Sequence, residues 1–264
     1  MRLCVPVTEA FRSRSETLLP LVDAVSFKGP SEEFYPGKTH FLESSYRIAD
    51  VGFRGQMEGS GCIAALRSGK YAAFSCDIGP NCERVTGRSR NSFPRAVPIS
   101  APISDEEYLD RAVRNVEWLR SQYPGEIQAE NNNYFPTGAY ERTCEPEFIS
   151  LVVRAARVSL LLDVGHALVS AHYLQYRSPM EYISQLPLDV VRGIQLSHAG
   201  SLNGVVEDLH EAPTDQDLRL VEEILAARAP VEFLSVEYYR HADILCSVYH
   251  SLDRWRFGLA GRRG

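Results

Sequence analysis

The sequence of 264 residues contains no apolar run near the roughly 20 residues that a membrane-spanning helix needs. Its start, MRLCVPVTEAFRSRSE, lacks the long apolar segment of a secretory signal. The six cysteines are scattered without a CxxC pair, which favours a cytosolic chain with free thiols over a disulfide scaffold. A net charge of -6 provides no field that would attract nucleic acid. These absences predict a cytoplasmic globular protein that binds neither a membrane nor nucleic acid.

A glycine-rich phosphate loop is also missing after the first apolar run, where an open doubly wound sheet would carry one. Short apolar runs recur instead and alternate with segments of helical periodicity, as parallel strands buried on both faces do. About seven or eight such units favour a TIM-type (β/α)8 barrel, with room for irregular or shortened early units. We expect a single barrel domain over residues 1–264. The runs are RLCVPV, DAVSF, KYAAFSC, GEIQAEN, RVSLLLDV, VRGIQLS and VEFLSVEYY.

Three segments between these runs carry helix start signals. Ser104 with Glu107 forms a capping box pattern, and Thr214 with Asp217 repeats it. Ser178 precedes a proline, which suits the first position of a helix. We therefore expect helices to begin at these three places.

Carboxylates and imidazoles stand where several apolar runs end. In a parallel barrel the carboxyl ends of the strands meet at one mouth, where active sites lie. A loop, EDLHEAP, supplies two more groups of the same kind to that mouth. The predicted cluster consists of Glu130, Asp163, His166, His198, Asp208, His210 and Glu237.

The four carboxylates of this cluster would repel one another within a few ångströms, and burying them unpaired costs several kcal/mol each. Metal cations remove that cost, and imidazole and carboxylate ligands suit zinc, iron or manganese. Seven ligands exceed the needs of one ion with open positions, which implies two or three ions. Each residue also has a simpler interpretation. Glu130 could form an ion pair, Asp163 could cap the next helix, and His198 could be a core imidazole.

The remaining histidines lie away from the ends of the apolar runs. His172, His241 and His250 are predicted to be surface or packing residues. His40 is undecided between a functional and a packing role.

The order Glu, Asp-x-x-His, His, Asp-x-His, Glu resembles the xylose-isomerase-like barrel superfamily and is the metal-ligand order of endonuclease IV. The segments ENNNYFPTGAY, LLLDVGHALVSAHY, IQLSHAG and DLHEAP more closely resemble the multinuclear non-heme iron-dependent oxidative enzymes, which include the methanobactin-forming oxidase. This resemblance is clearest from about Gly125 to Tyr239.

The resemblance implies a barrel that holds two or three iron ions and uses dioxygen, with zinc or manganese as alternatives. It implies a ribosomally made precursor peptide as substrate, modified at cysteine or another residue near one end, in natural-product biosynthesis. It also implies a separate partner protein that recognises the leader of the peptide. The seven residues of the predicted cluster would be the metal ligands. We expect Asp163, His198 and Glu237 to be essential for catalysis.

The early part of the chain departs from this family pattern. Both related branches use two further histidines from early strands, whereas SFKGPSEEF and AAFSCDIGP offer Lys28, Cys76 and Asp77. Neighbouring residues on a strand point to opposite faces, so only one of Cys76 and Asp77 should face the mouth. We predict Asp77 as the additional metal ligand, because a hard carboxylate suits iron and a thiol would oxidise there.

The aperiodic stretch from Asn131 to Cys144 lies at the same end of the predicted barrel. Loops of this length in compact domains are usually functional or disordered. The amides of Asn131, Asn132 and Asn133 could orient ligands or bind a peptide backbone, although asparagine also favours ordinary turns. Arg240 could meet a substrate carboxylate in a bidentate pair.

Other functions on the same barrel remain open. One is a zinc-dependent phosphodiesterase of the endonuclease IV type, which the acidic balance disfavours. Another is a metal-dependent sugar isomerase or epimerase. A third is a binding protein without catalytic activity, which the altered early strands leave open.

Overall fold

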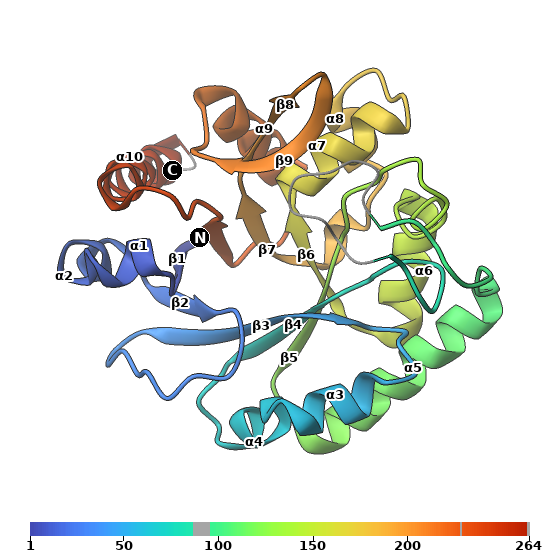
Figure 1. The fold of residues 1–264 in the computed structure, drawn as a ribbon. Helices are drawn as coiled ribbons and strands as arrows, with labels where there is room; N and C mark the ends of the chain where they lie inside the picture. Colours follow the sequence, from blue (N-terminus) through green and yellow to red (C-terminus); the bar gives the residue numbers. More distant parts are fainter. Residues whose placement is uncertain (87–95, 228, 263–264) are drawn as a thin grey trace.

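In the computed structural model, eight parallel strands form a closed barrel with helices around its outside (Figure 1). The structure describes residues 1–86, 96–227 and 229–262. Around the barrel the strands follow the order β1-β10-β7-β6-β5-β4-β3-β2, which confirms the predicted TIM-type barrel. The strands are β1 (Arg2–Pro6), β2 (Ala24–Phe27), β3 (Thr39–Arg47), β4 (Ala73–Asp77), β5 (Glu126–Glu130), β6 (Ser159–Asp163), β7 (Val191–Leu196) and β10 (Phe233–Val236).

Helical segments connect most successive strands, but residues 28–38, all of them described, pass from β2 to β3 without a helix. The early irregularity that the sequence allowed for is therefore present. The helical segments are α1 (Glu9–Arg12), α2 (Ser15–Leu18), η1 (Leu19–Leu21), α3 (Phe53–Gly59), α4 (Cys62–Arg67), α5 (Asp105–Gln122), α6 (Pro146–Ala156), α7 (Val164–Tyr173), α8 (Pro179–Ile183), η2 (Leu188–Val190), α9 (Asp215–Ala226) and α10 (Ala242–Arg262).

The three predicted helix starts are confirmed. The side chains of Ser104 and Ser178 accept backbone N–H groups at the starts of α5 and α8. Thr214 and Asp217 form a complete capping box at the start of α9. At α5 the box is incomplete because Glu107 accepts instead from Arg111, at 2.6 Å.

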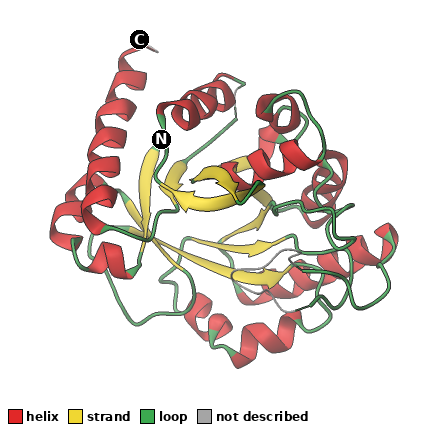
Figure 2. Cartoon of the chain, turned by 45° about the horizontal axis from the view of Figure 1, so that its top comes forward, coloured by secondary structure: helices red, strands yellow, loops and turns green. Residues whose placement is uncertain are grey.

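Two features were not predicted from the sequence. Strand β3 was missed because polar residues interrupt its short apolar run. The prediction of a loop at EDLHEAP was wrong, because β8 (His198–Leu202) and β9 (Val205–Glu211) form an antiparallel hairpin. Figure 2 shows the strands inside the ring of helices, with the loops that join them. Asp208 and His210 therefore lie on a strand.

Inward-facing side chains change from apolar to charged along the barrel axis, at intervals of two residues. A buried apolar group forms the floor: Cys4, Ala24, Phe41, Ala73, Leu161 and Phe233. The next inward positions are polar and buried: Ser26, Glu43, Ser75, Gln195 and Ser235. Two residues further, the strand ends place Lys28, Asp77, Ser197 and Glu237 around the mouth, while Asp163 lies level with Gln195 in the polar layer. The alternation of the strands thus places charge at their carboxyl ends.

All six cysteines are free, as predicted, and five of them are buried. Among the helices of the described residues, none has the length and apolar character needed to cross a membrane.

Candidate metal centre

The corner between β6 and α7 carries Asp163 and His166. Asp163 is completely buried, and its Oδ1 accepts the backbone N–H of His166 at 2.8 Å. Asp163 is therefore the N-cap of α7, which confirms the prediction that it could cap the next helix. Capping uses only one oxygen, so Oδ2 remains for another role.

The ring of His166 is fixed by a backbone carbonyl. Its Nδ1 lies 2.7 Å from the carbonyl oxygen of Asn131. Because a carbonyl oxygen only accepts, Nδ1 carries the hydrogen and Nε2 is directed to the other side. There Nε2 lies 3.8 Å from Asp163 Oδ2 and 3.7 Å from Asp208 Oδ2. Glu130 Oε1 lies 3.4 Å from Nδ1 of the same ring.

A bulge in the hairpin brings His210 into this group. Ala199 pairs with Asp208 while His198 pairs with Glu211, so two residues of β9 lie outside the regular register. His210 has a φ of 48°, in the left-handed region that a β-strand residue rarely adopts. Its Nε2 lies 3.5 Å from Asp208 Oδ2, and its backbone N–H donates to Asp208 Oδ1.

Two carboxylate oxygens at the centre of the group have no hydrogen-bond partner. Asp163 Oδ2 and Asp208 Oδ2 are both buried and unpaired, which costs several kcal/mol for an ionised group. Ligand atoms about 2.1 Å from a tetrahedral ion lie roughly 3.4 Å apart. The distances from these oxygens to the imidazole nitrogens, 3.5 to 3.8 Å, approach that value. The residues present therefore fit a metal ion.

A second group of possible metal donors overlaps with the first. Ligand atoms of Glu130, Asp163 and His166 all lie within 4.8 Å of one another. Burial, opposed by His166 and reinforced by Asp208, raises the pKa of Asp163 to about 7. Burial and the charge of Asp77 raise the pKa of Glu130 well above its usual range. Both shifts express the cost of bringing these carboxylates together without a cation.

His198 is held from its outer side by helix α9. Its Nδ1 lies 3.0 Å from Asp217 Oδ2, and the same oxygen accepts two hydrogen bonds from Thr214. A carboxylate on one imidazole nitrogen orients the other nitrogen, as outer partners of metal-bound histidines do. The His198 side chain is 34% exposed, and its described contact is with Asp217. Metal binding by His198 stays a prediction.

Glu237 lies just after β10 and is bound on both oxygens. Its Oε2 lies 3.1 Å from His210 Nε2, while Oε1 pairs with Lys28 and accepts from Gln195 at 3.0 Å. Burial alone would lower the pKa of His210, but the bond to Glu237 and the charge of Asp208 raise it to about 9. Glu43 accepts from the same Lys28 and Gln195.

Glu43 and Gln195 were missed by sequence reasoning. Both lie in the interior of a strand, one layer below the mouth, and not at its end. The available signal was a polar residue at an inward position of a barrel strand, where most barrels place apolar side chains.

The neighbours Cys76 and Asp77 face opposite sides of β4, as alternation requires. Cys76 is 1% exposed and belongs to the main apolar core, and burial raises the pKa of its thiol. Asp77 pairs in register with Glu130 and lines a cavity at the strand ends. His40 is buried between Phe27 and Phe34 and accepts the N–H of Tyr35 at 3.1 Å, which is a packing role.

We expect Asp77→Ala to weaken metal binding about tenfold or more, since its carboxylate faces Glu130. Cys76→Ser should leave metal content unchanged and lower the free energy of unfolding by about 1 kcal/mol, because a hydroxyl enters the apolar core. Metal analysis and thermal unfolding of both variants check this. An Asp77→Asn protein with unchanged metal content and activity would show that Asp77 only caps its turn.

The three asparagines after β5 differ in their surroundings. Asn131 is completely buried, and its amide exchanges two 2.9 Å hydrogen bonds with the backbone of Asp163. Asn131 therefore positions the corner that holds Asp163 and His166, whereas the Asn132 side chain accepts from Gly79 in the loop after β4. Asn133 Oδ1 is buried without a partner. A role in substrate binding stays a prediction for these asparagines and for Arg240.

Arg240 and the other histidines lie at the surface. Arg240 donates to the carbonyl oxygen of Leu209 at 2.9 Å, which ties it to the bulged part of β9. His172, His241 and His250 are exposed, in agreement with their predicted surface roles.

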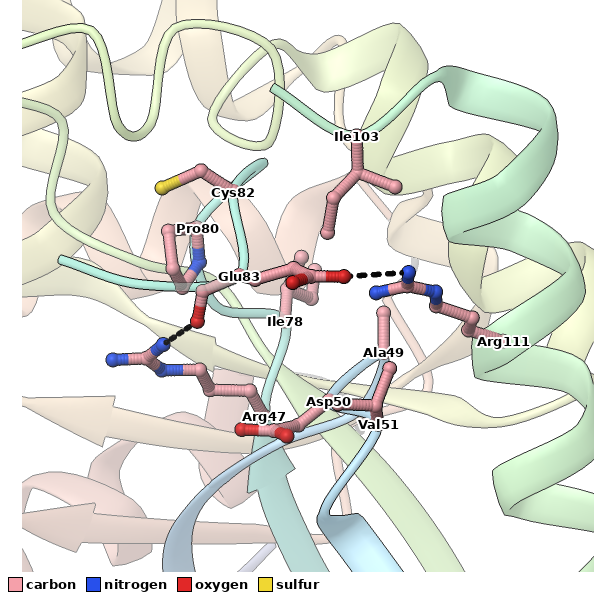
Figure 3. A pocket seen from close by; sticks show the side chains of 10 residues that line it. All are labelled: Arg47, Ala49, Asp50, Val51, Ile78, Pro80, Cys82, Glu83, Ile103 and Arg111. Carbon is pink, nitrogen blue, oxygen red and sulfur yellow. Dashed lines mark hydrogen bonds and ion pairs between the residues drawn. The ribbon is translucent and has the colours of Figure 1, made fainter. Parts of the chain in front are cut away.

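Two cavities lie beside β3 and β4. A small one of about 20 Å³ is lined by Glu83, whose carboxylate pairs with Arg111 and whose carbonyl accepts from Arg47 (Figure 3). Its arginines are thus engaged within the chain. The other, of about 320 Å³, is lined by Asp77 and by polar residues that include Ser45, Thr86 and Tyr140. Because Asp77 pairs with Glu130, this second cavity borders the candidate metal centre.

Solved structures share this fold at low sequence identity. A D-tagatose 3-epimerase-like protein has a TM-score of 0.65 and 13% identity, over 100% of both chains. Endonuclease IV from Thermus thermophilus has a TM-score of 0.59 and 14% identity, over 96% of this chain and 98% of that one. At such identities the similarity shows the barrel fold and nothing about the reaction.

Sequence comparisons are more specific. A UPF0276 protein of Caulobacter sp. (strain K31) is 30% identical over 125 residues, which are 44% of this chain and 45% of that protein. The match therefore spans less than half the length of this curated relative. The sequence model of the family described as "RiPP precursor modification enzyme MbnB/TglH/ChrH" matches residues 96–243, more than half of the chain. These residues include all seven groups of the predicted cluster, and the chain belongs to the MbnB/TglH/ChrH family of RiPP precursor modification enzymes.

Proposed function

We propose that this chain is an oxidase or oxygenase that uses iron ions and dioxygen to modify a residue, expected to be cysteine, of a ribosomally made precursor peptide. Family membership supports the peptide substrate. The resemblance to the iron-dependent oxidative enzymes supports iron, dioxygen and a separate protein that recognises the leader of the peptide.

The observation that carries the metal part of this proposal is the pair of buried, unpaired oxygens of Asp163 and Asp208. They face imidazole nitrogens of His166 and His210 at distances suited to a shared ion. No thiolate contributes from β4, because Cys76 faces the core. Imidazole and carboxylate donors suit iron, manganese and zinc, and among these iron supplies the electrons that dioxygen chemistry requires.

The protein itself would hold the metal ions and orient the side chains that bind them. Glu130, Asp163, His166, Asp208 and His210 would hold the ions, while the carbonyl of Asn131 fixes the ring of His166. Asp217 fixes the ring of His198 in the same manner. The cavity of about 320 Å³ beside Asp77 falls within the size range of ligand pockets and could receive part of a peptide next to the metal centre.

Metal content and oxygen dependence test the proposal together. Protein purified without added metal should contain two iron ions per chain, because five to seven ligands serve two ions that keep open positions. After loading with Fe²⁺, it should change the mass of a synthetic peptide ending in cysteine, by loss of hydrogen or gain of oxygen, only when air is admitted. Zinc in place of iron, or equal turnover under strict anaerobiosis, would favour the phosphodiesterase or isomerase instead.

A further inference from the structure

One side of the barrel mouth already contains a cation of its own. The ammonium group of Lys28, which follows β2, pairs with Glu43 of β3 and with Glu237 after β10. Gln195 Nε2 donates to the same two oxygens, at 2.8 Å to Glu43 Oε2 and 3.0 Å to Glu237 Oε1. The two carboxylates thus share two hydrogen-bond donors, the ammonium group of Lys28 and the side-chain amide of Gln195.

The burial of these carboxylates makes the ammonium group necessary. The side chains of Glu43 and Glu237 are 9% and 5% exposed. Two ionised carboxylates that share hydrogen-bond donors repel strongly in such surroundings, and a cation between them removes the cost. A single ammonium group and a divalent metal ion are alternative solutions to this problem.

Among the described residues, no lysine or arginine pairs with Asp163 or Asp208 on the opposite side of the mouth. Asp163 Oδ2 and Asp208 Oδ2 are buried without a hydrogen-bond partner, and their neighbours are the imidazoles of His166 and His210. The mouth therefore has two halves, one in which the carboxylates share the ammonium group of Lys28 and one in which they face imidazoles.

We propose that the Lys28 ammonium group takes the place of a metal ion between Glu43 and Glu237. Metal ions then bind only in the half that contains Asp163 and Asp208, which limits the chain to two. This inference rests on the proposed function only in assuming that this second half binds metal. Glu237 Oε2, which accepts from His210, remains available to the metal-binding half.

The consequence is that removing the charge of Lys28 creates a metal position. Lys28→Ala leaves Glu43 and Glu237 facing an open space, with Gln195 between them. Gln195 Oε1 is buried without a partner, so rotation of its amide would add a third oxygen ligand. Three oxygen donors are enough to retain a manganese ion that also keeps water molecules.

Counting Mn²⁺ per chain tests this directly. The metal-free full chain and its variants are loaded with Mn²⁺, separated from free metal and analysed by mass spectrometry of the elements. We expect at most two ions in the parent, one more in Lys28→Ala, and the parent count in Lys28→Arg, which keeps the charge. Combining Lys28→Ala with Glu43→Gln should return the count to that of the parent.

A parent that holds three ions would overturn the inference, and so would a folded Lys28→Ala protein whose count equals that of the parent. Lys28→Gln serves as the second neutral variant if alanine prevents folding, with the same expected gain of one ion. These counts use Mn²⁺ and no peptide. Failure of the iron, oxygen or peptide parts of the proposed function would therefore leave them unaffected.

Discussion

Replacing Asp163 by asparagine is expected to abolish metal binding in the half of the mouth that it serves and to reduce activity at least about 100-fold. Loss of an outer partner of a metal ligand already costs roughly 10- to 100-fold, so loss of a direct ligand should cost more. Asparagine keeps an oxygen that can accept the N–H of His166, so the cap of α7 survives. Its amide nitrogen then replaces Oδ2, the buried unpaired oxygen.

The measurement is metal content by elemental analysis, with thermal unfolding to show that the barrel remains folded. Asp50→Asn is a matched control, because Asp50 Oδ1 also accepts a backbone N–H, from Gly52 just before α3. We expect that variant to retain the parent metal content. An Asp163→Asn protein with unchanged metal would contradict the assignment of the site.

Gly165→Ala is expected to reduce metal affinity by roughly 10- to 100-fold although the substitution favours a helix. Gly165 lies in the first turn of α7, between Asp163 and His166. A Cβ atom there would overlap Ser197 Oγ and lie 3.0 Å from Cγ and Oδ1 of Asp208. Ser197 Oγ, which donates to Asp208 at 2.7 Å, must then move away, and loss of such an outer partner of a metal ligand costs roughly 10- to 100-fold in metal affinity.

Helix propensity alone predicts the opposite effect on stability, since alanine is preferred over glycine in helices by about 1 kcal/mol. Gly55→Ala provides the comparison, because Gly55 lies in α3 and an added Cβ meets no atom within 4 Å. That variant should keep its metal and gain stability. Titration of both metal-free variants with Mn²⁺ measures their affinities for the metal. Equal affinities would show that the position of Asp208 does not depend on the missing side chain at Gly165.

Several of these features could be predicted because they depend on local sequence. Apolar runs that alternate with capped helices require parallel strands covered on both faces, and a closed barrel satisfies that requirement. The predicted ligands stand at strand ends, which a parallel barrel collects at one mouth. The opposite orientations of Cys76 and Asp77 followed from strand alternation alone.

The hairpin could not be predicted in the same way. The segment EDLHEAP is polar and short, so its pairing with β8 depends on a partner strand and not on its own composition. The left-handed backbone of His210 likewise follows from the bulge in that pairing.

The sequence by itself determined the barrel and the kinds of side chain at its mouth. Only the tertiary structure decided which of them carry compensated charge. Lys28 and Glu237 are separated by 209 positions in the chain, and they meet because β1 pairs with both β2 and β10 when the barrel closes. The charge balance of a buried carboxylate is set by its neighbours in space. No local pattern could therefore show that Glu43 and Glu237 pair with a lysine while Asp163 and Asp208, among the described residues, face imidazoles.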